Sequence, residues 1–516
     1  MNLGRGHAVR RLGTFADCSF FHGRDGLRAV RLINSGPHDK EKWDGTEAVP
    51  PQFGVDLYPP DREGRAVSQK LFGTDGVRGV ANIEPITAES ALRLAGAAAR
   101  VLARHQSNST AIVGRDTRAS GEMLESAIAA GLASCGVNVL LAGVVPTPAI
   151  AYLTPTHQAV FGVVISASHN PFQDNGIKFF GPDGYKLSDQ LELAIEAEFF
   201  RTESRQPAPG KSVGRIRRLQ DSLEQYAAFA ASTVPKGFSL SGTTIAFDAA
   251  NGAAYETTPL LLARLGAQIK LIAAMPDGCN INRECGSTHP EAISALVRRT
   301  GATFGFTHDG DADRVLFCDE TGAPLDGDEL LAIASADLLA RGQLREKTVV
   351  ATVMSNFGLD AVLNGRGGKV LRTSVGDRYV MDAMIQHELN LGGEQSGHII
   401  FRDFTTTGDG LVAALQLMEI MQRTGKPLSE LRKILKKVPQ ILRNATVREK
   451  LPFEQFSDLM KQIAEAQSKL AGSGRVLLRY SGTEPKARLL LEGPDERELE
   501  ELAEGIVKEL TRNLGP

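Results

Sequence analysis

Three aspartates stand at alternate positions in THDGDADRVLFCDE, residues 307–320. Carboxylates this close repel one another unless a cation lies between them, and such hard oxygen ligands suit Mg²⁺ or Ca²⁺. Asp309, Asp311 and Asp313 are therefore candidate metal ligands, with a solvated acidic turn as the alternative. An EF-hand loop does not fit, because its sixth position requires glycine and holds Arg314 here, and the flanking ATFGFT and VLFC are typical of strands.

A second cluster lies in VVISASHNPFQDNGIKFFGPDG, residues 163–184. The apolar run VVI predicts a buried strand, and it is followed by Ser166, Ser168, His169 and Asn170. These residue types are ordinary in a turn, but they also suit an exposed nucleophile with helper groups. The residues alone do not decide between these two interpretations, nor between the two serines.

Further polar clusters contain groups that suit a phosphorylated sugar. RYSGTEPKAR combines two guanidinium groups, two hydroxyls and a flexible glycine, which could form an anion-binding turn or only a hairpin. GGEQSGH is a glycine-flanked polar loop, and GTDGVRG and GRDTR add arginines. The candidate residues in these motifs are Arg479, Ser481, Gly482, Thr483, Arg488, Glu394, Ser396, His398, Arg78, Arg115 and Arg118.

One strand–helix–strand pattern recurs after Lys70 and would position these clusters. AIVGRDTR followed by GEMLESAIAAGLASCGVNVLLAG shows the pattern first, and the segments from Thr243 and Thr348 repeat it. Each segment has a β-branched run, a helix with apolar residues three and four positions apart, and a returning strand. The pattern predicts three similar α/β domains with mixed, mostly parallel sheets.

The pattern changes after Leu431. RVLLRYSGTEPKARLLLEG is typical of two strands around a turn, and the next helix carries Leu499, Leu502, Ile506 and Leu510 on one face. We therefore predict a smaller α+β domain at 431–516, after α/β domains at 69–230, 231–343 and 344–430.

The first part of the chain, residues 1–68, has no sustained periodicity. We expect a disordered leader or the product of an upstream start codon. Asp17 and Asp25 disfavour an Arg-rich organellar leader.

Bulk properties exclude several classes of function. The net charge of −3 gives no reason to expect nucleic acid or an anionic membrane as a partner. No apolar run approaches the roughly 18 residues of a membrane span. The five cysteines lack zinc-site spacing, so we expect reduced thiols in a cytoplasmic protein. They are Cys18, Cys135, Cys279, Cys285 and Cys318.

The motifs GTDGVRG, SASHNP, DGDADR, GGEQSGH and RYSGTEP occur in this order from about Lys70 to the C-terminus. In this respect the chain resembles the α-D-phosphohexomutase superfamily, and within it the bacterial phosphoglucosamine mutase family. One departure is Ala312, where the superfamily usually has glycine, and this small change need not disturb coordination. The leader has no counterpart in the resemblance.

The resemblance implies an enzyme that interconverts glucosamine 6-phosphate and glucosamine 1-phosphate and so supplies UDP-N-acetylglucosamine and cell-wall precursors. It implies that Ser168 is the phosphoserine, and that one Mg²⁺ per subunit is held by Asp309, Asp311, Asp313 and a Ser168 phosphate oxygen. Glucosamine 1,6-bisphosphate or a similar sugar bisphosphate would be intermediate and activator. The resemblance also implies that the four domains are arranged around a central cleft and carry the phosphoserine, the metal, the sugar contacts and the phosphate contacts in turn.

Roles for the other candidates follow from the same resemblance. Lys178 and His169 are candidates for proton transfer or for stabilising transition-state charge, and Arg314 joins the substrate contacts. A monomer or homodimer is expected. A phosphomannomutase or phosphoglucomutase is the nearest alternative, and a Mg²⁺-dependent phosphatase and a non-catalytic sugar-phosphate binder are more distant ones.

Overall fold

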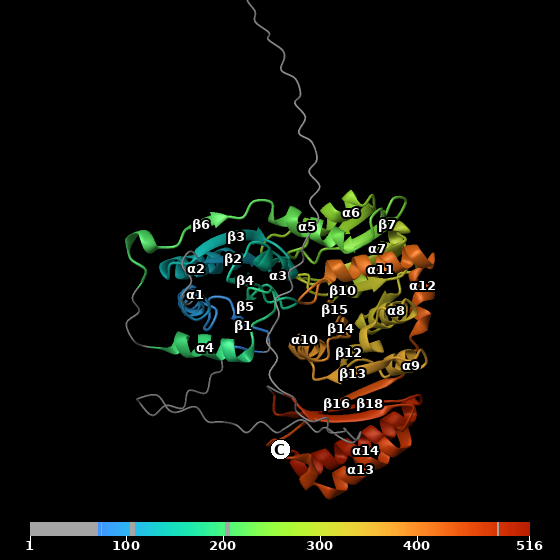
Figure 1. The fold of residues 1–516 in the computed structure, drawn as a ribbon. Coiled ribbons are helices and arrows are strands. Elements are labelled where there is room, and N and C mark those ends of the chain that lie inside the picture. The colour runs from blue at the N-terminus through green and yellow to red at the C-terminus, as the bar shows by residue number, and fades with distance from the viewer. Residues whose placement is uncertain (1–70, 74, 104–108, 202–206, 482–483) are drawn as a thin grey trace, which may run out of the picture. The chain divides into compact units, whose positions relative to one another are not determined.

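The computed structural model describes residues 71–73, 75–103, 109–201, 207–481 and 484–516. These residues belong to one compact unit, Gln69–Pro516, which is built on four sheets (Figure 1). The predicted leader at 1–68, Gly482 and Thr483 lie outside the described residues. In the part of the chain that is described, no helix is both long and apolar enough to cross a membrane.

The first sheet is covered by helices on both faces, which explains its apolar strand β4 (Phe161–Ile165). Phe161, Val163 and Ile165 pack in one cluster with α1 and α2, and Val164 packs in another with α3 and α5. The strand order is β1-β5-β4-β2-β3-β6, with β5 antiparallel to both neighbours. The other elements are β1 (Val77–Val80), α1 (Ala88–Leu102), β2 (Thr110–Arg115), α2 (Gly121–Ser134), β3 (Asn138–Val144), α3 (Thr147–Thr156), β5 (Asp174–Phe180), α4 (Asp189–Phe200), β6 (Ile216–Arg218) and α5 (Ser222–Ser232).

The second sheet has the order β11-β10-β9-β7-β8. β7 is parallel to β8 and β9, whereas the β9–β10 pair is antiparallel, so the aspartate segment joins two strands as predicted. The elements are β7 (Thr244–Asp248), α6 (Thr257–Arg264), β8 (Gln268–Ile272), α7 (Pro290–Thr300), β9 (Phe304–His308), β10 (Val315–Cys318) and β11 (Pro324–Leu325).

The third sheet has the order β13-β12-β14-β15, with only the β14–β15 pair antiparallel. Helix α8 (Gly327–Ala340) contacts α9, α11 and β14 of this segment, which favours a domain boundary before α8 rather than at 343. The domain boundaries stay predictions. The remaining elements are β12 (Thr348–Thr352), α9 (Gly358–Asn364), β13 (Lys369–Thr373), α10 (Asp377–Gln386), β14 (Leu391–Gly393), β15 (Ile399–Phe401), α11 (Gly410–Thr424) and α12 (Leu428–Leu431).

The C-terminal sheet is antiparallel, in the order β16-β18-β17, and two helices pack on it. The predicted pair of strands is β17 (Arg475–Tyr480) and β18 (Lys486–Glu492), and the predicted helix is α14 (Glu496–Leu514). The sequence reasoning did not identify β16 (Gln440–Thr446) or α13 (Ser457–Leu470). The predicted fold class, three mixed α/β segments and a smaller α+β segment, is confirmed.

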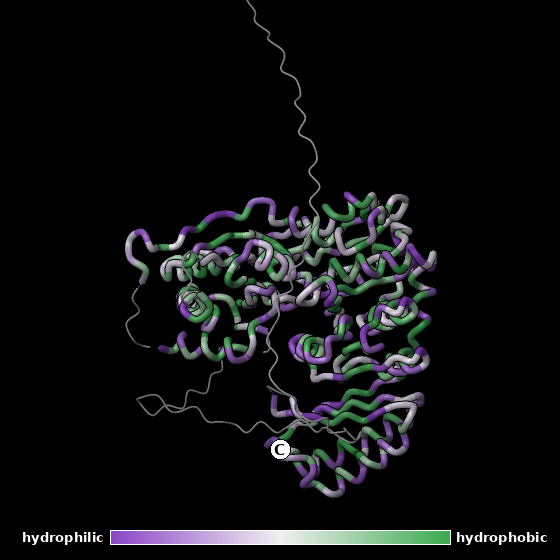
Figure 2. Tube along the Cα trace, viewed as in Figure 1, coloured by the Kyte–Doolittle hydropathy of each residue, from purple (hydrophilic) through white to green (hydrophobic). Residues whose placement is uncertain are grey.

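The cores of these segments are not equally shared. One continuous cluster of buried apolar residues includes Ile150 of the first segment, Phe306 of the second and Leu415 of the third. The C-terminal segment has a cluster formed by its own residues, such as Leu489 and Ile506. Figure 2 shows hydrophobic residues along the sheet strands, while the helices alternate between hydrophobic and hydrophilic residues.

Candidate active site

Ser168 lies in the loop that follows β4, with only 1% of its surface exposed. Its φ of 52° lies in the left-handed region, which a serine adopts only when its surroundings hold it there. The Ser168 hydroxyl donates to Asp309 Oδ2 at 2.5 Å, and its Oγ lies 3.4 Å from Nδ1 of His169. The structure therefore places this serine, not Ser166, against the aspartate cluster.

The three aspartates lie together between β9 and β10, and all are buried. One carboxylate oxygen from each lies within 4.8 Å of the others, and Oδ1 of Asp311 and of Asp313 has no hydrogen-bond partner among the described residues. Burial and repulsion by Asp313 and Asp311 raise the pKa of Asp309. Buried carboxylates with unsatisfied oxygens need a cation, so this cluster has the composition and geometry of a metal site.

Ala312 lies inside this cluster with a φ of 59°, in the left-handed region where glycine carries no steric penalty. Its peptide N–H donates to the Asp309 carbonyl at 3.1 Å, which closes the turn that presents the three carboxylates. The turn thus forms with alanine at this position.

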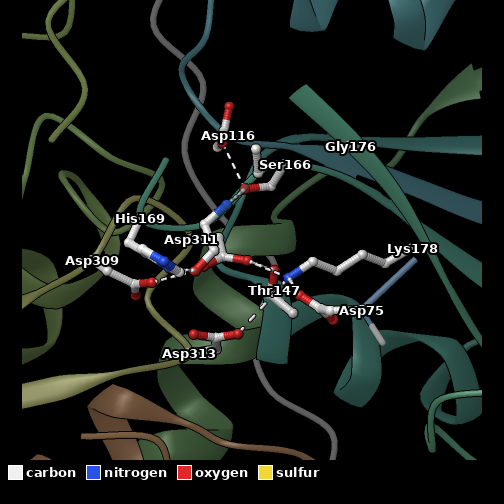
Figure 3. A network of polar contacts seen from close by, with 12 residues as sticks. Asp75, Asp116, Thr147, Ser166, His169, Gly176, Lys178, Asp309, Asp311 and Asp313 are labelled. Carbon is white, nitrogen blue, oxygen red and sulfur yellow. Dashed lines mark hydrogen bonds and ion pairs between the residues drawn. The ribbon is translucent and has the colours of Figure 1, made fainter. Parts of the chain in front are cut away.

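Lys178 extends from β5 to the aspartates as a buried cation. Its Nζ lies 3.0 Å from Asp311 Oδ2 and 2.9 Å from Asp75 Oδ2 (Figure 3). Burial alone would lower the pKa of Lys178, but the charges of Asp311, Asp75 and Asp313 raise it above its ordinary value. A permanently charged Lys178 fits charge stabilisation and does not fit proton transfer.

His169 has the opposite electrostatic environment. Burial, together with the positive charges of Arg314 and Arg78, lowers its pKa to about 4. The imidazole is therefore neutral near pH 7 and can accept a proton.

A chain of alternating charges connects this cluster to the third segment. Lys186 Nζ lies 2.5 Å from Asp75 Oδ1 and also pairs with Asp377 at the start of α10. His398 lies 3.7 Å from Asp313 and accepts a hydrogen bond at Nε2 from the Gly408 peptide, so in this geometry its proton is on Nδ1, facing Asp313. The carboxylates of Asp313 and Asp377 raise the pKa of His398 in opposition to burial.

Seven predicted residues from three segments line one pocket of about 560 Å³. The Glu394 carboxylate in this pocket accepts a hydrogen bond from the Gly376 peptide at 3.0 Å. Asp75, Gly376 and Asp377 line the same pocket and were not predicted as site residues. The predicted lining residues are Arg78, His169, Asp313, Arg314, Glu394, Ser396 and His398.

Arg115 does not line this pocket, and its guanidinium is held by glutamates of α2. Nη2 lies 3.1 Å from Glu122 and Nε 3.5 Å from Glu125. The role of Arg115 in substrate binding stays a prediction, because among the described residues its side chain makes no ion pair with the other predicted site residues.

Of the predicted phosphate-binding residues that the structure describes, Arg479 lies on β17, Arg488 lies on β18 and Ser481 directly follows β17. None of the three lines this pocket. Arg479 and Arg488 are cross-strand neighbours, and Arg488 pairs with Glu484 at 2.8 Å. Partial burial and the charge of Arg488 lower the pKa of Arg479. Ser481 is buried, and its hydroxyl accepts a hydrogen bond from the Glu484 peptide. Opposed guanidinium groups repel, so this sheet edge favours binding of an anion.

The sequence reasoning missed the residues that hold the reactive side chains. Asp75 lies in the quoted motif GTDGVRG and could have been selected as an acid in a glycine-rich turn. Lys186 and Thr147 offered no comparable signal, although the Thr147 hydroxyl donates to Asp311 Oδ2 at 2.7 Å. Their importance depends on contacts between distant parts of the chain.

Four family models match consecutive parts of this chain, all described as phosphoglucomutase/phosphomannomutase. Domain I matches residues 69–206, domain II 223–322, domain III 326–438 and the C-terminal domain 424–509.

Curated relatives cover most of this chain. Phosphoglucosamine mutase of Syntrophotalea carbinolica is 49% identical, over 87% of this chain and 99% of its own length. Phosphoglucosamine mutase of Anaeromyxobacter dehalogenans is also 49% identical, over 87% of this chain and 100% of its own length.

Solved structures share the fold. A phosphoglucomutase/phosphomannomutase family protein from Burkholderia thailandensis superposes with a TM-score of 0.71 at 23% identity, covering 86% of this chain and 97% of its own. N-acetylphosphoglucosamine mutase of Aspergillus fumigatus, solved with GlcNAc-6P and magnesium, has a TM-score of 0.60 at 18% identity, covering 86% of this chain and 95% of its own. The buried serine, the aspartate triad and these matches lead to one conclusion: the chain belongs to the phosphoglucosamine mutase family of the α-D-phosphohexomutase superfamily.

Proposed function

We propose that the protein interconverts glucosamine 6-phosphate and glucosamine 1-phosphate, through a phosphoserine at Ser168 and a sugar 1,6-bisphosphate. The observation that carries this proposal is the 2.5 Å contact between Ser168 Oγ and Asp309 inside a buried carboxylate triad. The adjacent pocket of about 560 Å³ combines arginines with sugar-binding side-chain types. The product of the proposed reaction would supply UDP-N-acetylglucosamine and cell-wall precursors.

One Mg²⁺ per subunit would be held by Asp309, Asp311, Asp313 and a phosphate oxygen on Ser168. The Oδ1 atoms of Asp311 and Asp313, which accept no hydrogen bond from the described residues, support this ligand set. Such a cation supplies charge neutralisation for phosphoryl transfer when it is bound.

The protein's own residues would manage the remaining charge and the proton. In the first half-reaction a sugar hydroxyl forms a bond to phosphorus as the bond from phosphorus to Ser168 Oγ breaks. The hydroxyl loses a proton as it bonds to phosphorus, and Oγ gains one as it departs; His169 would take part in this proton transfer, because its Nδ1 lies 3.4 Å from Oγ. Lys178 would stabilise the transferring group as a fixed cation.

The bisphosphate then turns over in the site and returns its other phosphate to Ser168. Arg78 and Arg314 line the pocket beside His169 and would bind the reacting phosphate. Glu394, Ser396 and His398 would bind the sugar hydroxyls. The phosphate that is not reacting would be held by Arg479, Ser481, Gly482, Thr483 and Arg488, and Arg115 keeps a predicted role in substrate binding. Enclosure by these loops would exclude water, which would otherwise hydrolyse the phosphoserine.

Preference for the amino sugar would come from charge. The glucosamine amine is largely cationic near neutral pH, and Asp75, Asp377 and Glu394 place carboxylates around the pocket. One contact between the amine and a carboxylate contributes about 1–3 kcal/mol to binding, which corresponds to roughly ten- to a hundredfold discrimination between the amino sugar and a sugar without the amine.

The test is kcat/KM for glucosamine, glucose and mannose 6-phosphates after identical priming with a sugar bisphosphate, the proposed activator. Glucosamine 6-phosphate is expected to be turned over most efficiently. Equal or better turnover of another sugar would remove the specificity and leave a phosphomannomutase or phosphoglucomutase. Rapid release of inorganic phosphate would indicate a phosphatase instead. A cytoplasmic location and a monomeric or homodimeric state stay predictions.

A further inference from the structure

The guanidinium of Arg118 is fully buried, and each of its five N–H groups has an acceptor. Nε donates to Asp116 Oδ2 at 2.8 Å. Nη1 donates to the carbonyls of Pro171 and of Asp174, and Nη2 donates to those of Ser168 at 2.9 Å and Asn170 at 2.8 Å. One side chain thus binds three carbonyls of the loop between β4 and β5, which carries Ser168, and the carbonyl of Asp174 at the start of β5.

A second side chain reaches two of the same carbonyls from the metal-bearing segment. Nδ2 of Asn282 donates to the Ser168 carbonyl at 2.9 Å and to the Asn170 carbonyl at 3.1 Å. Asn282 is itself fixed, because it is buried and its peptide N–H donates to the Ala250 carbonyl. The carbonyls on both sides of His169 therefore receive one donor from each of the two segments.

The other side of the Ser168 peptide is held as well. The Ser168 N–H donates to Ser166 Oγ at 2.9 Å, and the Ser166 hydroxyl donates to Asp116 Oδ2 at 2.6 Å. Asp116 is the same carboxylate that Arg118 binds. With its N–H and its carbonyl both fixed, Ser168 retains a left-handed backbone that presents Oγ to Asp309.

We propose that Arg118 and Asn282 are positioning residues for phosphoryl transfer, because together they fix the Ser168 loop against the aspartate triad. Neither side chain contacts Oγ in the structure, and neither lines the substrate pocket. The proposal concerns the proposed active site and so rests on the proposed function. Loss of either residue shifts Oγ relative to the triad, which impairs transfer and leaves sugar binding intact.

The chemistry of arginine is specific here. A lysine has three donors on one atom and cannot reach four carbonyls and a carboxylate in a plane. Arg118→Lys therefore retains the charge and loses most of the hydrogen bonds, so charge alone is not expected to restore function.

Asn282→Ala is the central variant, and Asn280→Ala is its matched control. Asn280 lies two residues away, and its amide contacts Met275 and Asp277 of its own loop rather than the Ser168 loop. For Asn282→Ala we expect kcat to fall roughly ten- to a hundredfold, with KM for glucosamine 6-phosphate within about twofold of the parent. The Mg²⁺ concentration for half-maximal rate should rise. Asn280→Ala should change none of these quantities.

A merely structural role would lower the melting temperature and leave kcat per folded molecule and the Mg²⁺ requirement unchanged, and that result would overturn the proposal. If Arg118→Lys fails to fold, the comparison of Asn282→Ala with Asn280→Ala tests the proposal without it. If the parent protein turns over none of the three sugar phosphates, the proposed function fails. The same variants are then compared by intact mass for the rate at which glucose 1,6-bisphosphate phosphorylates Ser168. A slower rate in Asn282→Ala supports positioning, an equal rate overturns it, and no phosphorylation of the parent overturns both proposals.

Discussion

The region around Ser168 and Asp309 and the region around Arg479 and Arg488 are built in different ways. The first lies on segments that share one apolar core, with its reactive side chains buried. The second lies on a sheet whose apolar core is its own, and Arg488 there is 35% exposed. Polar contacts connect this sheet to the third segment, such as those from Arg475 Nη2 to the Val353 and Ser355 carbonyls.

The difference corresponds to two tasks in the proposed reaction. Transfer of a phosphoryl group needs fixed geometry, which a shared core and buried hydrogen bonds provide. Capture of the opposite phosphate requires a region that admits a large anion and releases it when the bisphosphate turns over. A small interface of hydrogen bonds and ion pairs allows relative movement more readily than a shared core does.

The largest effect is expected from Ser168→Ala, which removes the nucleophile from the region around Ser168 and Asp309. Mutase turnover should fall at least about a thousandfold, because no other group replaces the hydroxyl. The free energy of unfolding should change by about 1 kcal/mol or less, since one hydrogen bond to Asp309 is lost. A coupled assay and thermal unfolding measure both quantities. Ser166→Ala is the comparison variant, and it should lose much less turnover because it removes only a hydrogen bond to the Ser168 peptide. Near-normal turnover in Ser168→Ala with loss in Ser166→Ala would reverse the assignment.

Metal removal should have the second-largest effect. This effect should be confined to the region around Ser168 and Asp309. Excess chelator is expected to lower turnover at least about a hundredfold, because the three aspartates then repel one another without a cation. It should also lower the free energy of unfolding by about 2–4 kcal/mol, since a saturating ligand stabilises only the folded state. Hydrogen exchange should increase around β9 and β10 but not in β17 and β18. Full activity in chelator would contradict the metal site.

Arg488→Ala tests the other region and should have a smaller effect. We expect kcat/KM for sugar phosphates to fall roughly ten- to a hundredfold, because a charge-assisted contact to phosphate is lost. Phosphorylation of Ser168 by a small donor, followed by intact mass, should persist. Arg443→Ala is the matched control, since Arg443 lies on the adjacent strand and pairs with Glu500 of α14. Equal kcat/KM in the Arg488 variant and the parent would remove the phosphate-binding role.

The smallest expected effect is the pH dependence of the free energy of unfolding that comes from Asp409, a buried carboxyl beside the shared core. Burial raises the pKa of Asp409 to about 6 from an ordinary value of 3.8, although it accepts hydrogen bonds from Tyr226 and from the Val412 peptide. Between these pH values the folded state holds a proton that the unfolded state has lost, so the free energy of unfolding falls as pH rises and levels off above about 6. The full difference is about 3 kcal/mol. Denaturant unfolding from pH 4 to 7 should show this decline in the parent and a reduced decline in Asp409→Asn, whose amide can accept the same bonds. Identical slopes would exclude Asp409 as the cause.

Local sequence patterns were sufficient to predict the fold class and the aspartate cluster, whereas the choice of Ser168 over Ser166 came from the family resemblance. The apolar run before Ser166 predicted a buried strand, and every residue of β4 is buried. The alternate aspartates predicted a cluster between two strands, and the structure brings Asp309, Asp311 and Asp313 within reach of one ion. These patterns are short-range, so the sequence displays them directly.

The supporting contacts could not be predicted, because they join distant residues. Nothing in GRDTR distinguishes Arg118, which is fully buried, from Arg115, which is held by Glu122 and Glu125 of α2. The sequence likewise gave no reason to pair Lys186 with Asp75 or Asn282 with the Ser168 carbonyl, which is 114 residues away. Such partners depend on how the segments dock.

The burial of Ser168 also restricts how its first phosphate can arrive. A protein kinase must draw an extended peptide around the acceptor hydroxyl into its own cleft. Ser168 is 1% exposed, and Arg118 holds three carbonyls of its loop and that of Asp174 where β5 begins, so the folded chain cannot present this hydroxyl to another macromolecule. We expect priming by a donor small enough to enter beside His169. The same burial shields the phosphorylated serine from protein phosphatases, so one priming event should serve many turnovers.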